Sequence, residues 1–471
     1  MRLLFVLLIA IAGNSLNAQK NGTILKKITK TADTLQSLTK RIFPTRKMAG
    51  SKPAESTDDN ALAGVYSASM SGDTIATGVV YLDAERLYQF NNGAAVMEKG
   101  TNQAMIDTKG RILVPYGRYS FIEVTRSKYP GAGLFPALDG AKAICLLATG
   151  KVIDIPGAEF IRLTEDGHYA VFRKNESSLV YIDKNDRRFH SSHWFSYITE
   201  GIGITSIEVK DNTERYSSIR SQKVFVRIKE NKILGASHYH DIFPFSDGMA
   251  IVAVKDQFGT VTYGFIDSTG KEVIPPIYSE KPSDFKSGLA KVIPRNKGKF
   301  LYAFIDKKGN VVLKHAIPDI ATTGGQFGPF TATGYAHSST SVMDVSGRIS
   351  PVKDFLLEKG GVKAEKNWTL MVPPEDKVDQ YQNGFLRYFR KPSRNRDDYN
   401  YGGFVNLKTG KAVSPSFRLD DGSWLLVFDP VSRLATAVKF MGRDANGIIW
   451  RKGYINEDGE FVMLLKPKSE W

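Results

Sequence analysis

The stretch FSDGMAIVAVKDQFGTVTYGFIDSTGKEVIPPIY at residues 245–278 is followed by a second version of itself, FKSGLAKVIPRNKGKFLYAFIDKKGNVVL, at residues 285–313. The two align from Phe245 and Phe285 to the last apolar run, with an offset of 40 residues at the phenylalanines. A fixed period of this length indicates a repeat architecture, in which each unit is one supersecondary motif. The fold is therefore set by how such units stack.

Each unit is predicted to be an antiparallel meander of three or four strands. GMAIVAV and YGFID are rich in apolar and β-branched residues, as strands are. The DSTG segment is predicted to be a tight turn, because the Asp267 carboxylate can accept backbone N–H groups and Gly270 supplies a positive φ. A third strand follows, and Pro275-Pro276 is predicted to end its ladder because proline has no N–H donor. One such meander cannot bury both faces alone, so stacked neighbours must complete the core.

Weaker copies of the Asp-x-x-Gly turn lie on both sides of these stretches, after MID at 105–107, VMD at 342–344 and YIN at 454–456. Further strand ends at Asp183 and Asn406 bring the estimate to about eight or nine units. The residues predicted to form structural turns are Asp107, Gly110, Asp267, Gly270, Asp306, Gly309, Asp344, Gly347, Asn456 and Gly459.

The pattern Gly-x-Ala, then Gly-Phe-Ile-Asp-x-x-Gly-Lys, then Val-Ile-Pro-Pro-x-Tyr resembles the WG (KWG) repeat of bacterial proteins, many of them exported. The family's Trp-Gly is Tyr263-Gly264 in one copy and Tyr302-Ala303 in the next. Counted generously, the resemblance covers about residues 85–465. It implies a β architecture with exported binding or surface roles, and no catalytic residues.

The predicted fold class is all-β, with tandem repeats of about 40 residues from 61 to 471 and one amphipathic helix before them. A period of this size with several strands per unit matches a propeller blade. The array either closes into a propeller-like or toroidal ring or remains an open solenoid, and irregular spacing between the repeats keeps both alternatives open.

The N-terminus carries two further segments. Residues 1–18 have the charged start, apolar run and small final residue of a secretory signal peptide. Residues 19–60 form a basic helix and a linker, with apolar residues spaced by three and four from Leu25 to Ile42 before Pro44. This helix docks on its own body or frays, lies peripherally on an anionic membrane, or self-associates, and the sequence leaves these three alternatives open.

Residues 19–56 contribute +7 to the net charge of +15, so the charge is denser in this tail than in the much longer remaining body. The mild charge of the remaining body gives no nucleic-acid footprint. No stretch after the signal peptide is long and apolar enough for a transmembrane helix.

Motifs for catalysis, cofactors or metals are missing from the sequence. Cys145 is the only cysteine, which excludes an intrachain disulfide and a multi-thiolate metal site, and its apolar surroundings predict burial. His238 and His240 could share a strand face, but no acid at ligand spacing joins them. The recurring aspartates fall at turn positions, where a structural role suffices. The basic, aromatic segment 387–391 either contacts an acidic glycan or forms a solvated loop.

These observations predict an exported, non-enzymatic binding or scaffold protein, located in the periplasm, at the cell surface or outside the cell. Its partner would be a protein or a glycan. The alternative is a secreted hydrolase that acts on polysaccharide, which would need two carboxylates about 5–10 Å apart in a concave site.

Cleavage of the signal peptide is expected after Ala18, leaving Gln19 as the first residue. The reason is the small residue that follows the ten-residue apolar run at 3–12. Intact mass analysis of the protein recovered from its native host checks this, and a mature chain that still begins at Met1 would contradict it.

Overall fold

The computed structural model of this chain describes residues 78–124, 131–175, 178–211, 218–235, 238–293, 302–315, 327–363, 368–370, 384–390, 401–418, 426–444 and 447–466. The chain divides into two compact units, Met1–Ala61 and Leu62–Trp471, and all described residues belong to the second. The predicted signal peptide and basic helix, residues 1–60, lie outside the described residues. Because the described body is built mostly of short antiparallel strands, the predicted β class is confirmed.

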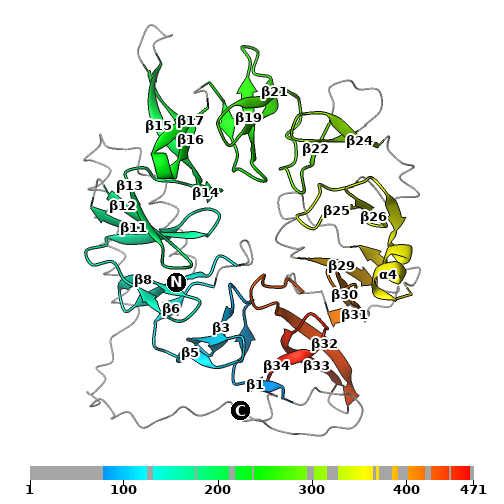
Figure 1. Ribbon diagram of the computed structural model, residues 1–471. Helices are drawn as coiled ribbons and strands as arrows, with labels where there is room; N and C mark the ends of the chain where they lie inside the picture. The colour runs from blue at the N-terminus through cyan, green and yellow to red at the C-terminus, as the bar shows by residue number, and fades with distance from the viewer. Residues whose placement is uncertain are drawn as a thin grey trace. The chain divides into compact units, whose positions relative to one another are not determined.

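The strands form successive meanders, which Figure 1 shows from blue to red in chain order. The first five meanders have four strands each: meander 1 has β2 (Arg86–Leu87), β3 (Ala94–Lys99), β4 (Asn102–Asp107) and β5 (Ile112–Val114); meander 2 has β6 (Phe121–Ile122), β7 (Leu134–Asp139), β8 (Lys142–Leu147) and β9 (Val152–Ile153); meander 3 has β10 (Phe160–Leu163), β11 (Tyr169–Asn175), β12 (Ser178–Asp183) and β13 (Arg188–Ser191); meander 4 has β14 (Tyr197–Thr199), β15 (Ile202–Asp211), β16 (Ser218–Arg227) and β17 (Lys232–Leu234); and meander 5 has β18 (Asp241–Ile242), β19 (Met249–Lys255), β20 (Val261–Asp267) and β21 (Glu272–Tyr278). A short 3-10 helix, η2 (Ile228–Glu230), lies between β16 and β17.

The second half continues the same plan. The remaining elements are meander 6 with β22 (Ala290–Val292), β23 (Tyr302–Ile305) and β24 (Val311–His315); meander 7 with β25 (Tyr335–His337), β26 (Ser341–Asp344) and β27 (Ile349–Pro351); helix α4 (Val352–Gly360); meander 8 with β28 (Trp368–Leu370), β29 (Phe385–Arg390), β30 (Tyr401–Asn406) and β31 (Ala412–Arg418); and meander 9 with β32 (Ala435–Asp444), β33 (Gly447–Ile455) and β34 (Phe461–Leu465). Meanders 8 and 9 share one sheet through the pair Phe417 and Lys439.

Neighbouring strands within each meander are antiparallel, and β1 (Val80–Leu82) is different. It comes before meander 1 in sequence but pairs in parallel with β34 of meander 9, with Val80 opposite Met463 and Leu82 opposite Leu465. The first strand of the described body thus covers the edge of its last meander.

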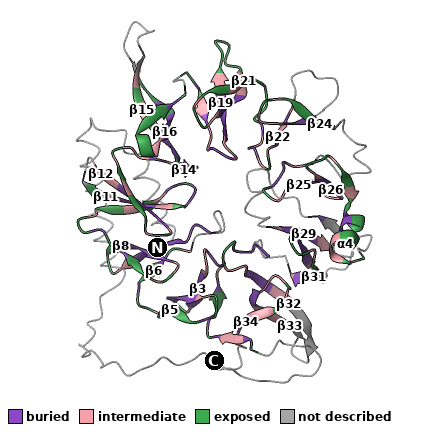
Figure 2. Ribbon diagram, viewed as in Figure 1, coloured by how far each residue is buried: buried purple, intermediate pink, exposed green. Residues whose placement is uncertain are grey.

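The inner strands of a meander bury both of their faces. In β19, Met249 and Ile251 belong to the core shared with meander 6, while Ala250 and Val252 belong to the core shared with meander 4. This explains why the strand is an unbroken apolar run, since neither face meets water. Figure 2 shows exposed residues on outer strands such as β5 and β24 instead.

The hydrophobic cores link the meanders in chain order. Each of eight buried clusters combines residues of two consecutive meanders, from meanders 1 and 2 to meanders 8 and 9. A ninth cluster joins Tyr454 and Met463 of meander 9 to Phe90 and Ile106 of meander 1. In the described part of the chain the series of cores therefore returns to its start.

Pro275 and Pro276 do not end the third strand, as the sequence had suggested. β21 runs through both prolines to Tyr278, which pairs with Tyr263, while Ile274 pairs with Phe265. The surplus residues form a bulge opposite Gly264, where an added Cβ would lie 2.4 Å from the Ile274 carbonyl oxygen and 2.7 Å from the Pro276 nitrogen. Proline fits because β21 is the outer strand, where a missing donor is harmless.

The glycine of the repeat dipeptide is thus required by close packing against the bulge. Gly403 repeats the arrangement, since an added Cβ would lie 2.3 Å from the Val413 carbonyl oxygen and 2.9 Å from the Pro415 nitrogen. In the copy that has Ala303, the outer strand contains no proline, and Ala303 pairs with Lys314 directly. Gly453 also packs against a bulged strand, β34, where an added Cβ would lie 2.0 Å from the Met463 carbonyl oxygen, although β34 contains no proline. The bulge and not the proline therefore requires glycine.

Two expectations about the second half need correction. The described body contains a helix, α4, whose buried Phe355 and Leu356 pack in the core between meanders 7 and 8. The basic, aromatic segment is not a loop up to residue 390, because it forms β29, in which Arg387 and Tyr388 are 3% and 0% exposed.

Gly264→Ala is expected to lower the free energy of unfolding by about 3 kcal/mol, because its Cβ must displace backbone atoms. Gly248→Ala is the control, since Gly248 has a positive φ but no atom within 4 Å of an added Cβ. It should cost only about 1 kcal/mol. Chemical denaturation midpoints measure both, and equal losses would contradict a steric role for Gly264.

Candidate functional site

The candidate site is built from the turns that lead into β11, β15, β19, β22 and β25 of successive meanders, and we call these turns, with the corresponding turns of the other meanders, the hairpin tips. In meander 5 the tip is Ser246–Met249, where each of these two residues donates its N–H to the other's carbonyl, at 2.8 and 3.2 Å. Asp247 and Gly248 between them have φ of 55° and 76°. This is the geometry of a two-residue type I′ hairpin, which matches the twist of the strands.

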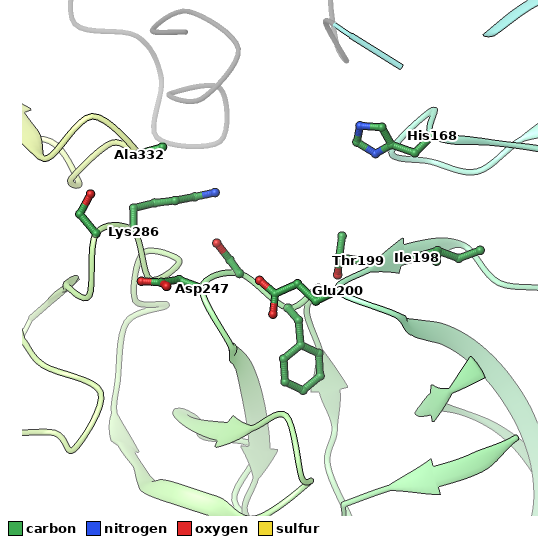
Figure 3. A pocket seen from close by; sticks show the side chains of 10 residues that line it. His168, Ile198, Thr199, Glu200, Asp247, Lys286 and Ala332 are labelled. Carbon is green, nitrogen blue, oxygen red and sulfur yellow. The ribbon is translucent and has the colours of Figure 1, made fainter. Parts of the chain in front are cut away.

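A cavity of about 640 Å³ lies among the tips of meanders 3 to 7 (Figure 3). Its size is in the range of small-molecule sites, roughly 300–1,000 Å³. The lining residues are His168 from meander 3; Ile198, Thr199 and Glu200 from meander 4; Phe245, Ser246 and Asp247 from meander 5; Lys286 and Ser287 from meander 6; and Ala332 from meander 7. Five successive repeats thus contribute to one concave surface.

Neighbouring tips are joined by hydrogen bonds that we call clasps. The Gly248 N–H donates to Glu200 Oε2 at 3.0 Å, and the Gly288 N–H donates to Asp247 Oδ2 at 2.7 Å. In both cases the carboxylate belongs to one tip and the glycine to the next. Glu200 and Asp247 hold φ near 50°, a conformation that costs roughly 1 kcal/mol or more for a residue with a Cβ. The clasps stabilise the tips in spite of this strain.

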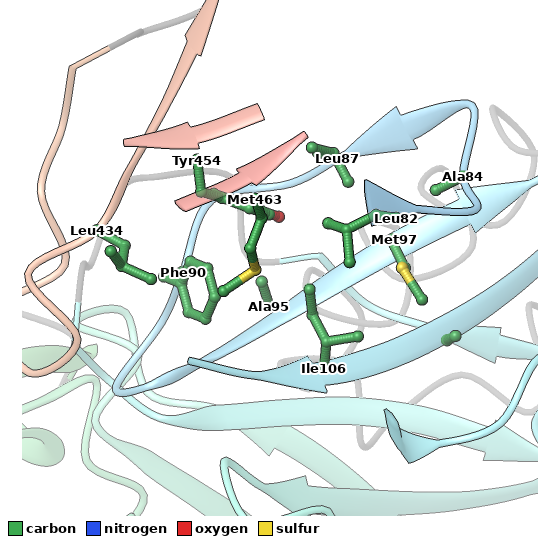
Figure 4. Close-up of a cluster of buried hydrophobic side chains, with 11 residues drawn as sticks. Leu82, Ala84, Leu87, Phe90, Ala95, Met97, Ile106, Leu434, Tyr454 and Met463 are labelled. Atoms are coloured by element: carbon green, nitrogen blue, oxygen red, sulfur yellow. The ribbon is translucent and has the colours of Figure 1, made fainter. Parts of the chain in front are cut away.

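A further clasp connects the last meander to the first. Asp429 is 1% exposed, and its carboxylate accepts the N–H groups of Asn92 at 2.6 Å and Gly93 at 3.0 Å. At the same junction, Tyr454 and Met463 pack against Phe90 and Ala95 (Figure 4). Strand pairing, core packing and a clasp thus all act at the junction of meanders 9 and 1.

The ten predicted turn residues all lie in turns of the expected form. Each side chain at the first position accepts the N–H groups two and four residues ahead; for Asp306 these are Lys308 and Asn310, both at 2.9 Å. The same pair of bonds occurs at Asp107, Asp267, Asp344 and Asn456. The fourth residues Gly110, Gly270, Gly309, Gly347 and Gly459 have φ between 76° and 89°. These residues hold the repeat together and do not line the cavity.

The turn glycines have a second role that the sequence did not indicate. A Cβ on Gly309 would lie 3.3 Å from Ile274 in the outer strand of the preceding meander, and one on Gly110 would lie 2.9 Å from Val80 of β1. Each turn therefore rests on the neighbouring meander, and β1 provides this surface for meander 1. The motif encodes the contact, but the partner is distant in sequence.

The charges of the cavity are largely balanced. Burial raises the pKa of Asp247, but the Lys307 Nζ at 2.8 Å and the Gly288 N–H outweigh this and hold the pKa below its usual range. Across the cavity, His168 Nδ1 lies 3.4 Å from Oδ2 of Asp166, which is 5% exposed. Asp166 also accepts the Ile198 N–H and the Thr164 hydroxyl. The cavity thus combines fixed carboxylates with an oriented imidazole.

The other residues weighed from the sequence do not reach this site. Cys145 is fully buried, and burial raises the pKa of its thiol to about 12, which suits a structural side chain. His238 and His240 are exposed on either side of buried Tyr239. No group of three His, Cys, Asp or Glu residues able to hold a metal ion is found among the described residues.

Sequence reasoning missed Glu200, His168 and the clasps. Glu200 and Asp247 each come directly before the glycine of their tip, a position where this turn favours asparagine or glycine. An acidic side chain at that position was the available signal, because it can accept a hydrogen bond. His168 follows a tip glycine, and nothing in the sequence marks its position beside the buried Asp166.

Asp429→Ala is expected to destabilise the body by about 3 kcal/mol, because the part-buried N–H groups of Asn92 and Gly93 lose a charged, buried acceptor. Hydrogen exchange should accelerate in residues 80–97. Asp256→Ala is the matched control, since its carboxylate accepts two N–H groups within one local turn, from Phe258 and Thr260. The same exchange pattern in both variants would contradict a closing role for Asp429.

The turn aspartates should make stability fall at acid pH. Hydrogen bonds from the Asn310 amide and from backbone N–H groups lower the pKa of Asp306 in the folded state. A depressed pKa contributes stability above the unfolded value, about 3.9, and this contribution is lost as pH falls through the folded value. Asp306→Asn should therefore lower the urea midpoint at about pH 7 and much less at about pH 3. An equal deficit at both values would contradict this.

The sequence and structure were compared with known proteins. Residues 263–297 match the family model described as WG containing repeat, and no curated protein matches the sequence. Among solved structures, dipeptidyl peptidase 4 of Porphyromonas gingivalis aligns at 9% identity and TM-score 0.36, over 79% of this chain and 65% of that chain. Oligogalacturonate lyase of Vibrio parahaemolyticus aligns at 10% identity and TM-score 0.27, over 75% and 93%. Hsv2 of Kluyveromyces lactis aligns at 10% identity and TM-score 0.26, over 69% of this chain and 96% of that chain.

The matched segment begins at Tyr263-Gly264 and includes the proline bulge of β21. The chain therefore contains a WG repeat at residues 263–297.

Proposed function

We propose that this chain is an exported, non-enzymatic binding or scaffold protein of the bacterial envelope or exterior, and that its ligand occupies the cavity at the hairpin tips. The observation that carries the proposal is the convergence of tips from meanders 3 to 7 on one concave surface. Binding surfaces on repeat proteins commonly combine residues from successive units in this way. The predicted signal peptide and the WG repeat support export.

We further propose that the meanders form a closed, propeller-like ring. The series of cores returns from meander 9 to meander 1, and β1 pairs with β34. An open solenoid would leave one face of its first and last units without a partner, whereas here each is covered by the other. A closed ring also holds the tips in fixed positions, which reduces the entropy lost when a ligand binds.

A polysaccharide hydrolase is the alternative, because Glu200 and Asp247 both line the cavity. The hydrogen bonds and the ion pair that these two carboxylates make favour binding over catalysis. Each carboxylate accepts a backbone N–H of the next tip, and Asp247 is also paired with Lys307. A general acid for glycoside cleavage needs a raised pKa, whereas that of Asp247 is lowered.

The distribution of charge along the chain bears on the kind of partner and on contact with a membrane. We propose a protein or glycan partner and no nucleic acid, since the body after residue 56 is only mildly basic for its length. Among the described residues no helix is long and apolar enough to cross a membrane. The basic segment at 19–60 would provide a peripheral membrane contact.

The test uses the mature chain, residues 19–471, as bait in envelope extracts and on a glycan array. Glu200→Gln is the informative variant, because its carbonyl oxygen can still accept the Gly248 N–H while the charge is lost. Glu230→Gln, on exposed η2, is the matched control. Capture should fall with Glu200→Gln only. Release of reducing ends from polysaccharide by the unmodified chain, abolished in Glu200→Gln, would establish the hydrolase instead.

A further inference from the structure

One side of the cavity presents polar groups that the fold does not use. Thr199 and Glu200 line the cavity next to each other at the end of β14 (Figure 3). Glu200 uses Oε2 in its clasp, and among the described residues neither its Oε1 nor the Thr199 hydroxyl makes a hydrogen bond. An acceptor and a hydroxyl are therefore available on one tip.

The adjacent tip adds a third group, the imidazole of His168. The carboxylate of Asp166 faces its Nδ1 at 3.4 Å, and Asp166 is itself fixed by the Ile198 N–H at 3.3 Å. The contact with Asp166 is made by Nδ1, and among the described residues Nε2 makes no hydrogen bond, so it can meet a ligand. Asp166 thus acts as a positioning residue for His168.

The charges around these groups select against ionic ligands. Glu200 and Asp247 disfavour an anion, and Lys286 with Lys307 disfavours a cation. A purely apolar ligand finds little surface, because Ile198 and Phe245, the large apolar lining residues, are each only 4% exposed. The lining thus combines apolar surface with a small number of placed polar groups, as ligand sites usually do.

We infer that the cavity binds a neutral, hydroxyl-rich ligand, a short oligosaccharide, through Thr199, Glu200 and His168; this inference rests on the proposed binding function. A sugar hydroxyl both donates and accepts, so one can donate to Glu200 Oε1 while another accepts from Thr199 or pairs with His168 Nε2. A peptide backbone has its donors and acceptors at fixed positions, and its large apolar side chains would meet only the 4% exposed Ile198 and Phe245.

The experiment is isothermal titration calorimetry of the mature chain with three neutral trisaccharides, maltotriose, cellotriose and triacetylchitotriose. Trigalacturonate and trilysine serve as anionic and cationic comparators. We expect at least one neutral trisaccharide to bind and both comparators to fail. Thr199→Val and Glu200→Gln should each weaken binding roughly threefold to tenfold, the value of one lost hydrogen bond.

Thr260→Val is the matched control, because Thr260 is exposed in the turn between β19 and β20, at the opposite end of the meander from the tips. It should leave the affinity unchanged, and melting temperatures verify that every variant is folded. Failure of all three neutral trisaccharides overturns the inference. Binding of trigalacturonate or trilysine that depends on Glu200 overturns it too, but leaves the proposed binding function intact. If envelope capture is also insensitive to Glu200→Gln, the proposed site itself is wrong.

Discussion

The structure depends on one constraint, that the inner strands of each meander are apolar on both faces. Alternate residues of β19 pack in two different cores, one shared with meander 4 and the other with meander 6. A sheet of this kind is stable only between two others, so the first and last sheets must find partners. Meeting each other solves this for both, and β1, the Asp429 clasp and the Tyr454 cluster provide the contact.

The predictable features were those encoded within one repeat. The Asp-x-x-Gly turn, the strand order and the need for stacked neighbours depend on residues a few positions apart, so they could be inferred from the sequence. The proline bulge was misinterpreted because the rule that proline ends a ladder holds for central strands, whereas β21 lies at an edge. Glycine at 264, read beside Pro275, would have been the signal.

The candidate site could not be inferred because it belongs to no single repeat. Each tip is a short turn whose sequence explains its own backbone, while the cavity appears only when five tips are adjacent. The same residues serve two purposes, since Glu200 has one oxygen in a clasp and the other facing the cavity. Ligand binding and the contact between meanders 4 and 5 are therefore linked, and a bound ligand would stabilise that junction.

The pairing of β1 with β34 has a consequence for how the chain acquires its structure during synthesis. The clasp at Asp429 joins residues 337 positions apart, so meander 1 can contact meander 9 only after almost all of the chain has been synthesised. During that time the apolar face with Phe90, Ala95 and Ile106 is exposed to water or to other chains. Contacts of such long sequence separation form slowly, and exposed strand edges favour aggregation. If the chain is exported as proposed, it meets this problem on the far side of the membrane, where a chaperone that covers the first meander would promote its contact with the last one.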